Sequence, residues 1–118
     1  AMLLAAKEHN AHIIEFTVAP MIHTDGELPY HEWLVSFEQV PDNLEAFRQT
    51  VDSHLRQKNI YYDDLITGNI LQTLKIRPLQ KNAFIEYMKS IGKLGGQNKV
   101  PRLSNDRKIA DDLIKFKL

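Results

Sequence analysis

Three polar side chains that could take part in chemistry lie close together near the end of the sequence: Gln97, Lys99 and Arg102. They follow the glycine pair at 95–96, which allows the backbone to approach a ligand or to swing, and Pro101 stiffens the exit. Lys99 and Arg102 thus place two cations on a loop, where they could bind an anionic ligand. If the chain assists any reaction, we predict that Lys99 is the residue that does so.

The spacing within this loop differs from that of the common phosphate-binding loop. That loop needs a lysine directly after the glycine run, then a hydroxyl residue, at the start of a helix. Here the lysine comes three residues after Gly96, and Val100 follows it. Composition alone therefore favours a solvated connector over a catalytic loop.

The other polar groups do not have the spacing of a metal or acid–base site. The five histidines include no pair four residues apart on a helix, and the chain has no cysteine, so we expect no metal. The aspartate pairs at 63–64 and 111–112 are adjacent in sequence, and adjacent residues on a helix do not face each other. Tyr61 and Tyr62, beside the first pair, are candidates for a polar binding edge.

Length and charge narrow the class of protein. A chain of 118 residues with 43% hydrophobic residues suits one domain with one core. Fifteen basic and fifteen acidic residues cancel, which argues against nucleic acid as a partner. The lack of cysteine fits a reducing compartment, and no apolar run reaches the roughly 18 residues of a membrane span. We predict a soluble, cytoplasmic protein without a membrane partner, and a sequence that opens partway through a helical pattern suggests a piece of a longer one.

Apolar periodicity predicts the elements of the N-terminal half. Residues 2–9 favour a helix, and alternation from 12 to about 22 predicts a strand with Ile14, Phe16 and Val18 on one face. An Asp-Gly turn at 25–26 then leads into a second alternating strand, so the two strands should form an antiparallel hairpin. Asp42 should cap a helix that ends at Asn59. The residues expected to face the core are Trp33, Val35 and Phe37 on the second strand and Leu44, Phe47, Val51 and Leu55 on the helix.

The C-terminal half predicts one more strand and two more helices. Residues 60–68 fit either one turn of helix or an ordered loop, and 74–79 predict a third strand. Asn82 should cap a helix that Gly92 ends, and Ser104 should cap the last helix. This order predicts an α+β fold: a small, mostly antiparallel sheet of about three strands with helices packed on it.

Four motifs resemble those of one known family. Glu15-Phe16-Thr17 and Trp33-Leu34-Val35 look like its opening hairpin, Leu74-Lys75-Ile76-Arg77 is similar to its third strand, and QNKVPR at 97–102 is similar to its Q-x-K-x-P-R signature. Over most of its length the chain resembles the C-terminal domain of the auxin-responsive acyl-acid amido synthetases, the Gretchen Hagen family of adenylate-forming enzymes. The chain departs from the plant members at Leu65, where they carry an arginine, and at Lys75, where they carry an acid.

The resemblance implies that residues 1–118 form the mobile C-terminal lid of a larger ligase whose large N-terminal domain, absent here, binds ATP with Mg²⁺ and an acyl acid. Lys99 would then be catalytic in adenylation, and Gln97, Arg102 and Tyr61 would contact the nucleotide. The partners would be the chain's own N-terminal domain, a carboxylic acid and an amino acid, joined by a C–N bond. The fragment alone should be inactive. The alternative is a free-standing α+β module that binds a ligand or protein without catalysis.

Overall fold

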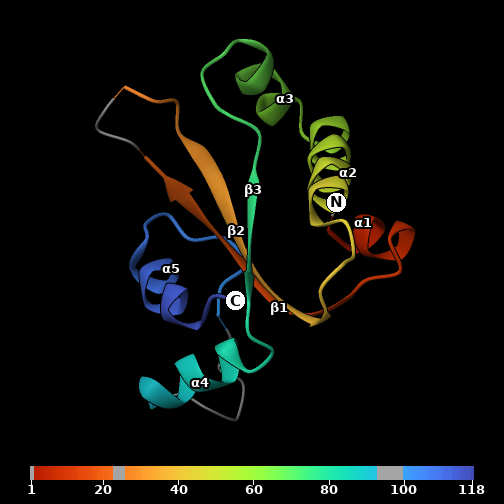
Figure 1. The fold of residues 1–118 in the computed structure, drawn as a ribbon. Helices are drawn as coiled ribbons and strands as arrows, with labels where there is room; N and C mark the ends of the chain where they lie inside the picture. The colour runs from red at the N-terminus through yellow and green to blue at the C-terminus, as the bar shows by residue number, and fades with distance from the viewer. Residues whose placement is uncertain (1, 23–25, 93–99) are drawn as a thin grey trace.

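A computed structural model describes residues 2–22, 26–92 and 100–118 of the chain, and Figure 1 shows its arrangement. The elements, in chain order, are α1 (Met2–Glu8), β1 (His12–Met21), β2 (Tyr30–Gln39), α2 (Leu44–Lys58), α3 (Ile60–Thr67), β3 (Lys75–Leu79), α4 (Ala83–Ser90), α5 (Lys108–Leu113) and the short 3₁₀ helix η1 (Ile114–Phe116). The predicted α+β class is confirmed, and the segment at 60–68, for which a loop was the alternative, is helical.

The sheet has the order β1-β2-β3, with β2 in the centre. β1 and β2 pair antiparallel as the predicted hairpin, whereas β3 pairs parallel to β2. A parallel partner needs a long crossover, and the chain between β2 and β3 supplies one that contains α2 and α3. The sheet is therefore mixed rather than wholly antiparallel.

Helices cover both faces of this sheet. One core joins α1 and α2 to the face that carries Trp33, Val35 and Phe37, as the alternation predicted. A second core joins α4 and α5 to the other face, through Leu34 and Leu79. Figure 1 shows α1 and α2 on the opposite side of the strands from α5. Neighbouring residues of β2 point to opposite faces, so one strand contributes to both cores.

Three details of the predicted elements were wrong. Ile14 is 42% exposed, because a register shift in β1 between Ile13 and Glu15 directs Ile13 to the core instead. The residue that caps α2 is Asn43, whose side chain accepts from the backbone N of Ala46 at 3.0 Å, and not Asp42. Ser104 caps no helix, since α5 begins only at Lys108.

Tyr62 joins α3 to two other elements through its buried hydroxyl group. The hydroxyl donates to the carboxylate of Asp52 on α2 and accepts from the backbone N of Leu74 at 2.9 Å. Tyr62 is 3% exposed, and burial together with the Asp52 carboxylate raises the pKa of its phenol. The ring of His31 on β2 stacks against Tyr62 with 6.0 Å between the centroids, and burial lowers the pKa of this imidazole.

The substitution Tyr62→Phe should lower the free energy of unfolding by about 2 kcal/mol, because it leaves a buried carboxylate and a buried N–H without their partner. Urea denaturation at neutral pH measures this change. Tyr61→Phe is the matched control: that side chain is 79% exposed, so its loss of a hydroxyl should change stability by less than about 0.5 kcal/mol. Equal effects of the two substitutions would contradict the role given to Tyr62.

The histidine at 31 should make stability depend on pH. Its pKa is lower in the folded chain than in the unfolded one, so the unfolded chain binds more protons below pH of about 6.5. The free energy of unfolding should therefore fall as the pH drops below that value, and His31→Gln should reduce this slope. Denaturation curves between pH of about 7 and 5 compare His31→Gln with the unsubstituted chain, and equal slopes in the two proteins would contradict the role given to His31.

Candidate functional site

The end of the glycine-bearing loop is attached to the outer edge of β1. The backbone N of Val18 donates to the carbonyl of Arg102 at 2.8 Å, and the backbone N of Ser104 donates to the carbonyl of Val18 at 2.9 Å. Leu103 pairs with Val18 as a parallel bridge. Pro101 can occupy this position because an edge strand tolerates a residue without an N–H donor. The residues after the loop thus extend the sheet by a short stretch beside β1.

The side chain of Thr17, on β1, also holds this segment. Its hydroxyl donates to the carbonyl of Pro101 at 2.6 Å, and the side chain is only 1% exposed. Val100, one residue earlier, is buried in the core formed with α4 and α5. The first described residues after the loop are therefore held by both a hydrogen bond and apolar packing.

Arg102 points along β1 and is held by two side chains there. Its guanidinium lies 4.3 Å from the centroid of the Phe16 ring, and its Nη2 lies 3.3 Å from Oε1 of Glu15. Phe16 in turn stacks on Trp33 with 5.6 Å between centroids and an angle of 9° between the rings. The Arg102 side chain remains 61% exposed. It is thus an oriented cation, open to solvent and partly balanced by Glu15, that can still meet an anion.

A second attachment follows a few residues later, at the buried carboxylate of Glu32. This side chain on β2 is 2% exposed and accepts from Nη2 of Arg107 at 2.8 Å and from Nη2 of Arg77 at 3.3 Å. Arg107 also donates to the carbonyl of Pro20 at 3.2 Å and lies 3.1 Å from Asp111. Sequence reasoning missed this cluster, because a glutamate on an alternating strand normally faces water. The only signals for it were one arginine on β3, Arg77, and one just before the last helix, Arg107.

The structure describes two of the four predicted site residues, and it places these two apart. Gln97 and Lys99 lie outside the described residues. Arg102 lies against β1, whereas Tyr61 lies on α3, where it is 79% exposed and its neighbour Tyr62 is buried. No contact joins Arg102 to Tyr61 among the described residues, because they belong to different edges of the fold.

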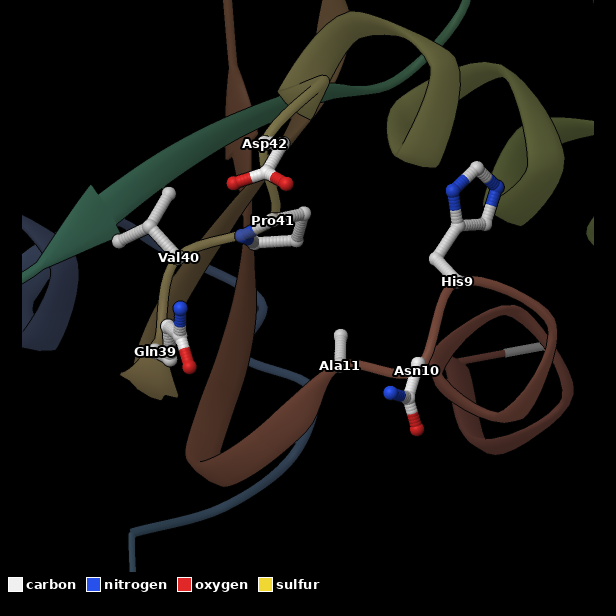
Figure 2. A pocket seen from close by; sticks show the side chains of 7 residues that line it. All are labelled: His9, Asn10, Ala11, Gln39, Val40, Pro41 and Asp42. Carbon is white, nitrogen blue, oxygen red and sulfur yellow. The ribbon is translucent and has the colours of Figure 1, made fainter.

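A hollow of about 260 Å³ lies between the end of α1 and the turn that leads from β2 to α2. Figure 2 shows the side chains that line it. Nε2 of His9 lies 2.8 Å from the hydroxyl of Thr50, which itself donates to the carbonyl of Ala46, so a neutral His9 donates through Nε2. Neither Arg102 nor Tyr61, the two predicted site residues that the structure describes, lines this hollow. The residues that line it are His9, Asn10, Ala11, Gln39, Val40, Pro41 and Asp42.

Two other kinds of feature are missing from the described ranges. No group of three or more histidine or acidic side chains in these ranges is arranged to hold a metal ion. None of the helices in the same ranges has the length and apolar character needed to cross a membrane.

The fold is similar to that of two solved structures. One is titled "GH3.15 acyl acid amido synthetase", with a TM-score of 0.74, 17% sequence identity, and coverage of 99% of this chain and 21% of that chain. The other is titled "AtGH3.15 acyl acid amido synthetase in complex with 2,4-DB", with a TM-score of 0.72, 18% identity, and coverage of 99% of this chain and 22% of that one. The present chain thus spans about a fifth of the length of these structures.

The sequence itself matches a family model over most of its length. The model is described as the GH3 family C-terminal domain, and it covers residues 1–108. A comparison with curated proteins finds no match. The family model ends at Lys108, the first residue of α5, and it includes both β1 and the Q-x-K-x-P-R signature at 97–102. The chain belongs to the GH3 family, and its residues correspond to that family's C-terminal domain.

Proposed function

We propose that this chain is the mobile C-terminal domain of an ATP-dependent acyl acid amido synthetase. The observation that carries the proposal is the match of the GH3 C-terminal family model to residues 1–108. The likeness in fold to two acyl acid amido synthetases supports it, because each of them contains this fold as about a fifth of a longer chain.

The proposed reaction has two steps. In the first, a carboxylate oxygen of the acid attacks the α-phosphorus of ATP, an acyl adenylate forms, and pyrophosphate leaves. In the second, the amino group of an amino acid attacks the acyl carbon, the C–N bond forms, and AMP leaves with the electrons of the broken C–O bond. The remainder of the polypeptide would hold ATP, Mg²⁺ and the acid, and this domain would close over them in the cytoplasm.

Lys99 is the residue that we propose acts in the first step. A lysine ammonium near the α-phosphate would stabilise the negative charge that develops there as the carboxylate attacks. Gln97 would orient the loop, and Tyr61 would contact the nucleotide. Arg102 suits a supporting role toward a phosphate, since its guanidinium is oriented on Phe16 and is still open to solvent.

The alternative is a free-standing α+β binding module. The length of the native open reading frame separates the two proposals. Several hundred residues upstream of Met2 would support the synthetase, whereas a gene product no longer than these residues would support the module.

The substitution Lys99→Ala in the full-length protein should slow ATP–pyrophosphate exchange by about a hundredfold, the usual cost of removing one preorganised donor to a developing charge. Lys93→Ala is the matched control, because it removes a lysine from the same stretch of sequence outside the Q-x-K-x-P-R signature. Thermal unfolding of both variants verifies that they fold. Near-normal exchange by Lys99→Ala with every acid that the unmodified protein activates would contradict the role of Lys99.

A further inference from the structure

The outward face of α3 and the turn after it expose an unusual amount of apolar surface. Four large apolar side chains are exposed between residues 60 and 70: Ile60 by 68%, Tyr61 by 79%, Leu65 by 37% and Ile70 by 59%. A helix on the surface of a folded domain normally presents polar residues to water. Contiguous apolar patches on a surface mark sites of interaction.

These four side chains form one surface, which we call the α3 patch. Tyr61 and Leu65 are four residues apart, so they are neighbours on the same face of the helix. Gly68 follows on that face, and a Cβ placed on it would lie 3.9 Å from Cδ1 of Ile70. The backbone N of Ile70 also donates to the carbonyl of Leu65 at 3.0 Å, which holds the turn against the helix. Ile60 extends the patch at the start of the helix.

The α3 patch is not needed to hold α3 in the fold. The inner face of the helix is held by Tyr62, which contacts Asp52 and Leu74. At the side, Asp63 pairs with Arg56 at 2.6 Å. The described contacts that hold α3 in the fold therefore do not involve the four side chains of the patch.

We propose that the α3 patch is the surface through which this domain docks onto the remainder of its own polypeptide. The proposal rests on the proposed function, which makes the chain one part of a longer protein. In the two similar structures about four-fifths of the chain lies outside this fold. If the proposed function holds, the remainder of this polypeptide is a large, covalently linked partner of the same kind. A linked partner can be held by a small patch, because linkage raises its effective concentration.

The chemistry of the α3 patch defines the surface that it fits. An exposed tyrosine surrounded by aliphatic side chains is typical of the anchor residue of an interface. Asp64 is exposed on the same face of the helix, between Ile60 and Gly68, and has no ion-pair partner among the described residues. The complementary surface should therefore be an apolar hollow with a lysine or arginine opposite Asp64.

A second copy of this chain suits the α3 patch less well. A symmetric dimer would bring the two copies of the same patch together, and with them the two Asp64 carboxylates. Four side chains also supply a few hundred Å² at most, whereas a stable dimer buries about 800 Å² on each partner. The charge and the area both favour a linked partner.

Alkylation of introduced cysteines tests the proposal, since these 118 residues contain no cysteine. Ile60→Cys and Ile70→Cys place a thiol at each end of the α3 patch, and neither residue is a predicted nucleotide contact. Ile85→Cys is the matched control, because Ile85 is 50% exposed on α4, across the sheet from α2. Iodoacetamide labelling is followed by peptide mass spectrometry in the full-length protein and in the 118-residue chain, with and without ATP and the carboxylic acid.

In the full-length protein, both patch cysteines should react about tenfold more slowly than in the short chain, in at least one ligand state, because a docked surface reacts only when it opens. Ile85→Cys should react equally in both proteins. Equal rates at both patch cysteines in every ligand state would overturn the proposal. The proposal would also be overturned if the patch cysteines of the short chain reacted more slowly as its concentration was raised. That result would assign the patch to a second copy of the chain.

The same labelling separates this proposal from the proposed function. Protection at residues 60 and 70 without any ATP–pyrophosphate exchange would support docking and count against the synthetase. Exchange with unprotected cysteines would overturn docking and leave the synthetase intact.

Discussion

The buried carboxylate of Glu32 in the central strand constrains the second half of the fold. A carboxylate that is 2% exposed is costly unless cations and hydrogen bonds neutralise it, and Arg107 and Arg77 do so from two other segments. Arg107 immediately precedes α5, so this ion pair determines where the chain returns after the glycine-bearing loop. Through Arg107 the return segment also reaches the carbonyl of Pro20 on β1.

The return segment and the C-terminus each cover part of one edge of the sheet. Residues 102–104 bond to the edge of β1 at Val18, while on the other edge the backbone N of Gln80 donates to the carbonyl of Phe116 at 2.8 Å. Exposed strand edges invite pairing with other chains, and these contacts cover part of both edges. Helices cover both faces of the sheet, and among the described residues the neighbourhood of Arg102 and the outer face of α3 are two surfaces that remain open to a partner.

Local patterns predicted the elements well where one face of an element is apolar throughout. The alternation of Trp33, Val35 and Phe37 marked one face of β2, and the helical spacing of Phe47 and Val51 marked the buried side of α2. The errors came where two neighbouring residues were equally good helix caps, or where one extra residue interrupted the alternation of a strand. Adjacent aspartate and asparagine both cap helices, and a bulge in β1 has no signature in a run of isoleucines.

The sequence by itself determined the α+β class, the hairpin, the main helices and, through QNKVPR at 97–102, the family. These features depend on neighbouring residues, whose periodicity and motifs can be read directly. Only the tertiary structure decided that β3 runs parallel to β2, that Glu32 is buried between two arginines, and that Tyr62 faces inward while Tyr61 faces outward. Each of these depends on contacts between segments far apart in the chain. The role of Lys99 rests on the sequence, and the structure adds that the loop's exit, from Val100 to Ser104, is held against β1.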